Sequence, residues 1–252
     1  LVTIDLDVPV EFHIQDFERQ PMDTQKLTEL LQDLELTSIL NKIDKFSGDS
    51  IMDVKEKVKK LYTTILTKSD LNTLCDHLLC SEMISFDTET TSIDPHRAEI
   101  VGMSFSTKSN IGCYIPIQFP ENDKTTELSL EDVINKLRPL FEDDSIKFCG
   151  QNIKYDALVM LRYGIQLNGI IFDTMIAAHL IRPDLSTLKL DTLSQLYLSY
   201  RMCPIEDLIG TGSNQKTMDK VPLDEISFYG AEDADVALQL TEILGEALKD
   251  ED

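Results

Sequence analysis

The sequence predicts an α/β fold in which helices flank a mixed β-sheet, and three observations carry this prediction. Three apolar segments, residues 83–87, 99–107 and 111–117, follow one another with only short turn-like stretches between them, which is the pattern of an antiparallel meander. From residue 129 onward, amphipathic helical patterns alternate with short apolar strands, as in sheets with parallel strands. The chain has 252 residues, of which 42% are hydrophobic, so it is long enough to bury a full core.

The segments before the meander are expected to belong to different units. Residues 1–46 combine a short alternating strand pattern with one or two amphipathic helices, but they lack the bulk of an independent domain. Residues 47–60 are mostly small, polar or charged, with few apolar anchors, so we interpret them as a linker. A new unit over residues 61–252 begins with a predicted strand near Leu61, followed by a helix that Ser69 is expected to cap.

The second half of this unit is predicted to contain more helix than strand. In chain order, the expected elements are a helix capped by Ser129, a strand over 146–150, a helix capped by Asn152, a strand running into a helix over 170–181, a helix over 190–200, a loop over 210–216, and a long helix from Pro222 to about Leu248.

The charge balance limits the partners that the chain can bind. Asp and Glu number 45 against 23 Lys and Arg, which gives a formal net charge of −22. This balance argues against a broad basic surface for nucleic acid, so any nucleic-acid binding must be local. The five cysteines include no C-x-x-C pair, and no apolar run approaches the roughly 18 residues of a membrane span. We therefore expect a cytoplasmic protein without a disulfide framework, a zinc site or a membrane segment. The chain begins at Leu1 rather than Met, and we expect it to be part of a longer protein.

Carboxylates gather at several predicted element ends. Asp87 and Glu89 follow a buried strand, and because side chains alternate along a strand they point to the same face. An isolated pair of this kind is usually a solvated strand end. Here, however, Asp156 lies one turn into the helix after strand 146–150, and Tyr229 and Asp233 share one face of the long helix. We therefore expect the four carboxylates to meet at one edge of the sheet.

Four carboxylates at one locus would repel one another unless a cation neutralised them. Oxygen ligands select hard divalent ions such as Mg²⁺ or Mn²⁺ rather than zinc. Two such ions about 4 Å apart can hold a phosphodiester, activate a water and stabilise the leaving oxygen. The pattern thus predicts a site for two divalent metal ions.

Three motifs resemble those of a known family. DTET at 87–90, NIKYD at 152–156 and YGAED at 229–233 look like the motifs of the DEDD-type 3′→5′ exonucleases, in the tyrosine subclass. From about residue 61 to the end, the chain resembles the proofreading exonuclease domain of the bacterial family A polymerases, the DNA polymerase I enzymes. Residues 1–46 resemble the C-terminal tail of the 5′ nuclease domain that precedes it in these enzymes.

The resemblance implies a ribonuclease H-like fold and hydrolysis of the terminal phosphodiester at a DNA 3′ end, with release of nucleoside monophosphates. By motif, Asp87, Glu89 and Asp233 would bind the first metal ion, and Asp87 and Asp156 would bridge to the second. Tyr229 would orient the attacking water. Every motif position holds its usual residue type, so activity is expected.

The same resemblance implies four substrate contacts. Gln151, Asn152 and Tyr155 would contact the DNA, with the Tyr155 ring available for stacking. Ile93 stands where relatives commonly carry a leucine that wedges against the last base. The implied partners are a single-stranded or frayed DNA 3′ end and covalently linked polymerase and 5′ nuclease domains, and we expect the isolated domain to be a monomer.

Two alternatives remain open at this point. One is a catalytically idle module that positions the polymerase or binds single strands. The other is an exonuclease that acts on RNA 3′ ends, as in the similar ribonuclease D branch. Other acidic residues are assigned plainer roles: Asp235 is expected to face solvent or cap a helix, and Asp173 to cap one.

Overall fold

The computed structural model describes residues 59–120, 126–212 and 215–250, and only isolated positions before residue 59. The chain divides into two compact units, Leu1–Lys55 and Glu56–Asp252. The predicted nuclease tail over 1–46 and most of the predicted linker over 47–60 therefore lie outside the described residues. Both assignments stay predictions.

Six strands form one mixed sheet in the second unit. They are β1 (Leu61–Thr64), β2 (Ile84–Thr90), β3 (Ile100–Lys108), β4 (Ile111–Pro116), β5 (Phe148–Gly150) and β6 (Ile170–Asp173), in the spatial order β1-β4-β3-β2-β5-β6. The strands β2, β3 and β4 pair antiparallel, which confirms the predicted meander. The pairs β1–β4, β2–β5 and β5–β6 are parallel, so the predicted mixed α/β sheet is confirmed.

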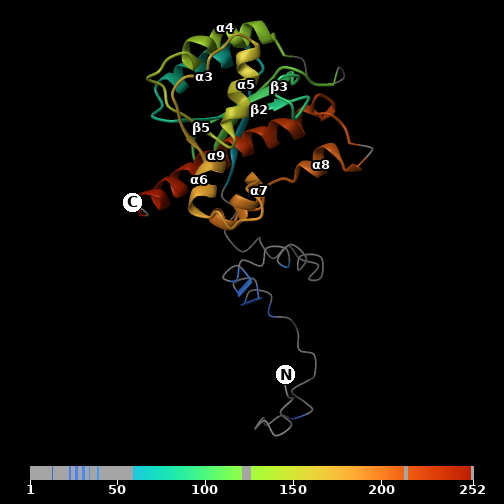
Figure 1. The fold of residues 1–252 in the computed structure, drawn as a ribbon. Helices are drawn as coiled ribbons and strands as arrows, with labels where there is room; N and C mark the ends of the chain where they lie inside the picture. The colour runs from blue at the N-terminus through green and yellow to red at the C-terminus, as the bar shows by residue number, and fades with distance from the viewer. Residues whose placement is uncertain are drawn as a thin grey trace. The chain divides into compact units, whose positions relative to one another are not determined.

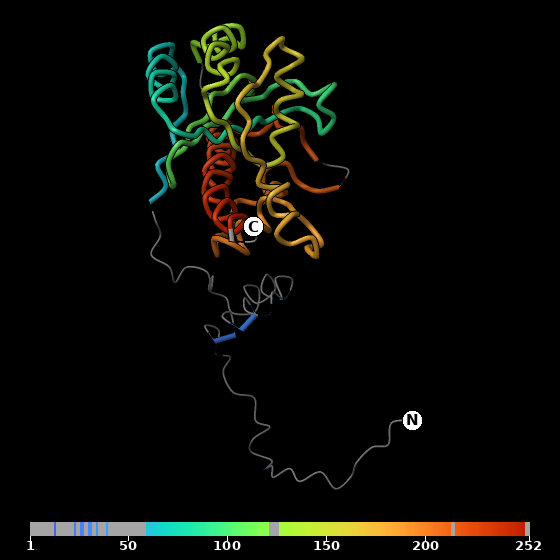
Figure 2. The backbone as a smooth tube through the Cα atoms, turned by 60° about the vertical axis from the view of Figure 1, so that its left-hand side comes forward, coloured from blue at the N-terminus to red at the C-terminus, as the bar shows by residue number. Residues whose placement is uncertain are grey.

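Helices cover both faces of the sheet (Figures 1 and 2). Those that the structure describes are α3 (Lys68–Leu79), α4 (Leu130–Phe141), α5 (Ile153–Arg162), α6 (Thr174–Ile181), α7 (Leu190–Leu193), a π-helix (Ser194–Leu198), α8 (Ile205–Ile209), a 3₁₀ helix (Met218–Lys220) and α9 (Leu223–Asp250). The helices α3, α4 and α5 lie on one face, and the long helix α9 runs across the other.

The main hydrophobic core lies between the sheet and helices α3, α4 and α5. Its centre is a group of phenylalanine rings, in which Phe86 of β2 lies 5.2 Å from Phe105 and 4.9 Å from Phe141, measured between ring centroids. These side chains are at most 1% exposed. Burying such rings is the main source of stability for an α/β layer, and it fixes which face of β2 looks toward α5.

One predicted helix cap was wrong, and a second occupies the predicted position without making a side-chain capping bond. The first helix of the unit begins at Lys68, so Thr67 rather than Ser69 is its cap and accepts the amide hydrogen of Asp70. Asn152 does precede α5, but its φ of 55° is left-handed and its side chain makes no capping bond. Its own amide instead donates to Asp173 at 3.1 Å, and asparagine tolerates this backbone conformation better than most residues. The predicted Ser129 cap is confirmed, as a capping box with Asp132.

The prediction for Asp235 was also wrong. This residue is 0% exposed, and its carboxylate accepts hydrogen bonds from Lys60 Nζ and Tyr62 Oη at 2.7 Å, from the Asn110 amide at 2.7 Å and from Gln239 at 2.8 Å. Its burial against the sheet is compensated by Lys60, which precedes β1, and by polar groups of β1 and the β3–β4 turn. Asp173 does cap α6 as predicted, accepting from Met175 and Ile176.

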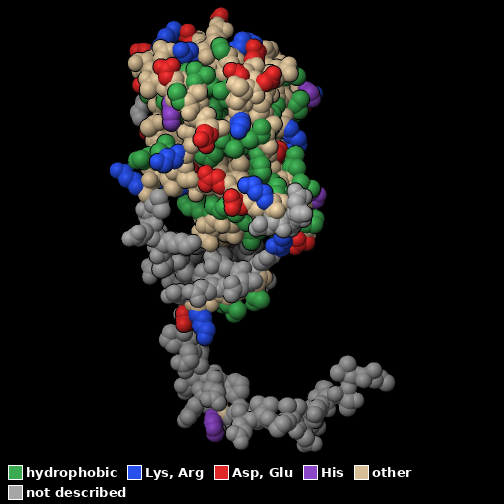
Figure 3. Space-filling view, turned by 90° about the vertical axis from the view of Figure 1, so that its left-hand side faces the viewer, with side chains coloured by type: hydrophobic (Ala, Val, Ile, Leu, Met, Phe, Trp, Pro, Cys, Tyr) green, Lys and Arg blue, Asp and Glu red, His purple; other side chains and the backbone are tan. Residues whose placement is uncertain are grey.

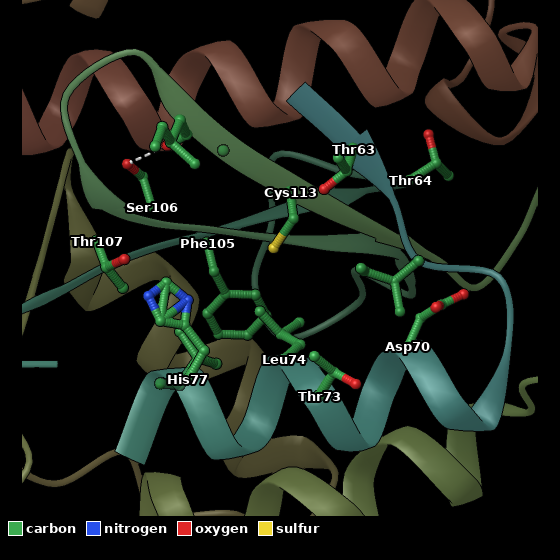
Figure 4. Close-up of a pocket in the computed structure, with 14 residues that line it drawn as sticks. Thr63, Thr64, Asp70, Thr73, Leu74, His77, Phe105, Ser106, Thr107 and Cys113 are labelled. Carbon is green, nitrogen blue, oxygen red and sulfur yellow. Dashed lines mark hydrogen bonds between the residues drawn. The ribbon is translucent and has the colours of Figure 1, made fainter. Parts of the chain in front are cut away.

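A pocket opens between α3 and the sheet, as Figure 4 shows. Leu74 and His77 of α3 form one wall, and Phe105 and Cys113 of the sheet form the other. Because Phe105 belongs to the core on the α3–α5 side, this pocket is separate from the carboxylates described next.

Candidate metal centre

Strand β2 presents its acidic residues to the α9 side of the sheet. Asp87 pairs with Ser104 of β3, and Glu89 pairs with Gly102, so both carboxylates stand on one face. The threonines between them point the other way, toward α5, where Thr88 donates to Asp156 and Thr90 bonds the Tyr155 hydroxyl at 2.6 Å. The alternation predicted from the sequence is confirmed.

Helix α9 brings the third carboxylate onto this face. Carboxylate oxygens of Asp87, Glu89 and Asp233 lie within 4.8 Å of one another. Tyr229 lies one turn earlier on α9, where burial and then the charge of Asp233 raise the pKa of its hydroxyl. Ile226 on the same helix face is 1% exposed, so this face looks inward, as the sequence pattern predicts.

Asp156 does not join the other three directly. It is 2% exposed, and one carboxylate oxygen accepts both the Thr88 amide at 2.9 Å and the Thr88 hydroxyl at 2.5 Å. Asp156 is therefore not one of the three carboxylates that converge most closely, although the charge of Asp87 contributes to the raised pKa of Asp156. Asp156 approaches from α5, on the opposite side of β2, and its charge still acts on Glu89.

Burial dominates the electrostatics of the four groups. It raises the pKa of Asp87 to about 7. Burial, followed by the charges of neighbouring carboxylates, raises the pKa values of Glu89, Asp156 and Asp233 well above their usual range. Within the described part of the chain, no basic side chain contributes to the raised pKa of Asp87 or Glu89. Among the described residues, these two carboxylates therefore have no neighbouring positive charge that compensates their negative charge.

One carboxylate oxygen of this cluster is left without a partner. Asp233 Oδ1 is buried and accepts no hydrogen bond from the described part of the chain. A buried, unsatisfied carboxylate oxygen is costly. A bound cation would satisfy it.

A groove runs past Glu89 and contains three of the four predicted substrate contacts. Ile93, Asn152 and Tyr155 line it. The Ile93 side chain is 98% exposed, and it is free to touch a ligand. Gln151 does not line this groove, because its amide group donates to the Leu188 carbonyl at 2.7 Å.

Further residues that line the groove were missed by the sequence analysis. They are Ile205 and Ile209 of α8, Gln215, Lys216 and Thr217 of the following loop, and Met218 of the 3₁₀ helix. The loop expected over 210–216 was the sequence signal for these residues. Its approach to β2 could not be predicted, because the two segments are far apart in the sequence. Over the face drawn in Figure 3, the described Lys and Arg side chains are scattered among other residues instead of forming one patch.

Residues 62–249 match the model of a protein family described as 3′-5′ exonuclease. The chain belongs to this exonuclease family. The match spans the sheet and every described helix that contributes to the carboxylate cluster and the groove, and it confirms the resemblance seen in the motifs.

DNA polymerase I enzymes are relatives of this exonuclease chain. It is 29% identical over 255 aligned residues to the DNA polymerase I of Pseudomonas aeruginosa. This alignment covers 99% of this chain and 28% of the relative. It is 36% identical over 196 residues to the enzyme of Borreliella burgdorferi, covering 78% of this chain and 20% of the relative. The exonuclease chain thus spans less than a third of the length of these relatives.

The fold has solved neighbours among ribonucleases. Escherichia coli RNase D, an exoribonuclease involved in structured RNA processing, superposes with a TM-score of 0.56 and 19% identity, over 75% of this chain and 45% of that one. This likeness supports the ribonuclease H-like exonuclease fold. Among the described residues of our exonuclease, no helix combines the length and apolarity needed to cross a membrane.

Proposed function

We propose that the chain is the proofreading exonuclease domain of a DNA polymerase I and removes nucleotides from the 3′ end of single-stranded or frayed DNA. The observation that carries the proposal is the cluster of Asp87, Glu89 and Asp233, in which Glu89 is buried and the other two are half-buried, beside an open groove with an exposed apolar side chain and a tyrosine. The natural partners would be covalently linked polymerase and 5′ nuclease domains, and the isolated domain would be a monomer.

The residues present fit hard divalent cations. Every donor is a carboxylate oxygen, one buried oxygen of Asp233 has no partner among the described residues, and oxygen donors favour Mg²⁺ or Mn²⁺. Asp87, Glu89 and Asp233 would hold one ion, and Asp87 and Asp156 would hold a second. When bound, such ions lower the pKa of a water and neutralise charge on the leaving oxygen.

The side chains around the cluster position the reacting groups. Burial raises the pKa of Tyr229 far above neutrality, so its hydroxyl stays protonated and orients the attacking water as a hydrogen-bonding group instead of removing its proton. Thr88 holds the carboxylate of Asp156 through two hydrogen bonds. This fixed orientation matters because a small misplacement of a catalytic group strongly lowers the reaction rate.

The groove would hold the last nucleotides of the strand. Ile93 would pack against the terminal base, and Asn152 and Tyr155 would contact the strand beside it. The Tyr155 hydroxyl is held by Thr90, which keeps the ring at the groove wall. Gln151 would act indirectly, because its amide supports the Leu188 carbonyl.

An RNA substrate is the second candidate, favoured by the structural likeness to RNase D. Two oligonucleotides of the same sequence, one DNA and one RNA, each labelled at the 5′ end, would decide between them. We expect a Mg²⁺-dependent ladder that shortens the DNA from its 3′ end, with much slower loss of RNA. Faster RNA degradation would move the proposal to the ribonuclease branch, and intact strands of both kinds with metal-saturated protein would favour the catalytically idle module.

A further inference from the structure

Tyr114 of β4 lies behind the carboxylate cluster and belongs to none of the roles assigned so far. Its backbone pairs with Ser104 of β3, and Ser104 pairs with Asp87 of β2. Residues paired across neighbouring strands present their side chains to the same face. The Tyr114 ring therefore stands on the α9 side of the sheet together with Asp87, and it is 0% exposed.

Two glycines make room for this ring. A Cβ atom added at Gly102 would lie 2.1 Å from the Tyr114 hydroxyl oxygen, and one added at Gly230 of α9 would lie 2.8 Å from a ring carbon. Gly102 is also the cross-strand partner of Glu89. The hydroxyl thus occupies the side-chain space of the residue directly opposite Glu89, where cross-strand Cβ positions are about 4.5–5.5 Å apart.

The hydroxyl is buried without a hydrogen-bond partner in the described part of the chain. After burial itself, the charges that most raise its pKa are those of Glu89 and then Asp87. An unsatisfied buried hydroxyl destabilises a fold, and phenylalanine would fill the same space without that penalty. Stability alone therefore does not account for a tyrosine at this position.

We propose that Tyr114 is a positioning residue for Glu89, whose carboxylate receives a hydrogen bond from the Tyr114 hydroxyl, directly or through one buried water, in the cation-loaded site. The inference rests on the proposed function in so far as Glu89 binds the cation. Tyr114 itself touches neither substrate nor reacting atoms. It acts by restricting the orientations that Glu89 can adopt, as outer-shell partners of metal ligands do.

The test is Tyr114→Phe, with Tyr163→Phe as the matched control. The Tyr163 hydroxyl accepts the Ile100 amide at 3.2 Å and is not part of the carboxylate cluster. We expect Tyr114→Phe to unfold in chelator at the wild-type temperature or above it, yet to bind Mn²⁺ roughly 10-fold more weakly in titration calorimetry. Tyr163→Phe should lower the unfolding temperature and leave Mn²⁺ affinity unchanged.

A double-variant cycle separates positioning of Glu89 from a general effect on the site. In a Glu89→Gln background, Tyr114→Phe should cause no further loss of Mn²⁺ affinity, because the group that it orients is already altered. Wild-type Mn²⁺ affinity in the single variant, or equal losses in both backgrounds, would overturn the inference. Calorimetry needs no nucleic acid, so a failure to degrade DNA would count against the proposed function and not against Tyr114.

Discussion

Burial raises the pKa of Asp87 to about 7, whereas an unfolded chain would give this group a pKa near 4. A folded-state pKa above the unfolded one means that the native protein binds more protons between these values, so stability falls as pH rises through the window. The stabilising contribution is fully present below about pH 4 and is lost above about pH 7. Glu89, Asp156 and Asp233 shift in the same direction.

Ionisation of Asp87 should make the stability of the protein depend on pH. In the presence of chelator, the unfolding temperature of the wild type should fall between pH 5 and 8, beyond the fall seen in Asp87→Asn, because the variant cannot ionise at this position. Added Mg²⁺ should reverse the fall at pH 8. Thermal unfolding at several pH values checks this, with Asp76→Asn, an exposed carboxylate on α3, as control. Equal pH slopes for the wild type and Asp87→Asn would contradict the assignment.

At the scale of elements, the contacts of Asp235 join helix α9 to strand β1 and to the turn between β3 and β4. Lys60 Nζ lies 2.7 Å from the Asp235 carboxylate, and the two side chains are 15% and 0% exposed. Removing one partner of a buried pair leaves the other charge uncompensated. The same network sits two residues from Asp233, so it also anchors the part of α9 that carries the cluster.

We predict that Asp235→Ala lowers the free energy of unfolding by about 3–5 kcal/mol. The exposed pair of Asp94 and Arg97, at 3.6 Å, supplies the comparison, since Asp94→Ala should change the same quantity by less than about 1 kcal/mol. Urea unfolding followed by circular dichroism measures both. Similar losses in the free energy of unfolding for the two variants would show that the buried Asp235 pair stabilises the fold no more than an exposed pair does.

The loop after α8 supplies Lys216, the one Lys or Arg among the described residues that line the groove beside Glu89. In a protein of net charge −22, a cation at this position would attract the phosphate backbone of the bound strand. Lys216→Gln should raise KM for single-stranded DNA and reduce the slope of log affinity against log salt by about 0.7, while kcat stays nearly constant. Steady-state kinetics at several salt concentrations measure these values.

Lys220→Gln is the matched control, because Lys220 pairs with Asp219 at 2.7 Å and does not line the groove. It should leave KM and its salt dependence close to the wild-type values. If the slope of log affinity against log salt is unchanged in Lys216→Gln, this loop does not bind the substrate.

What the sequence predicted correctly depends on local periodicity. The alternation along β2 places Asp87 and Glu89 together, and the helical repeat places Tyr229 and Asp233 together, whatever the rest of the chain does. Asp235 could not be assigned in this way, because its partners Lys60 and Asn110 are distant in sequence. The position of Asp156 depends likewise on which face of the sheet α5 covers, and no local pattern states that.

At the scale of the whole molecule, the net negative charge and the limited length of the chain both weaken DNA binding. The chain covers 28% of the Pseudomonas aeruginosa relative, so under the proposed function an assay of these residues alone would exclude any DNA contacts made by linked domains. We predict that nucleotide release by the isolated chain requires high protein concentration and slows steeply as salt is raised, because few phosphate contacts remain. Rates that stay constant between low and physiological salt would argue against this account.

The central claim is that buried carboxylates hold divalent cations for hydrolysis at a DNA 3′ end. It is tested most directly by the rate of 3′-terminal nucleotide release across a Mg²⁺ titration, for the wild type, Asp87→Asn and Asp76→Asn at low salt. The account predicts a rate that saturates with Mg²⁺ in the wild type and Asp76→Asn, and a loss of at least about 100-fold in Asp87→Asn, the typical scale for removing a group that stabilises the transition state. Equal rates in Asp87→Asn and the wild type, or a wild-type rate that ignores Mg²⁺ and chelator, would contradict it.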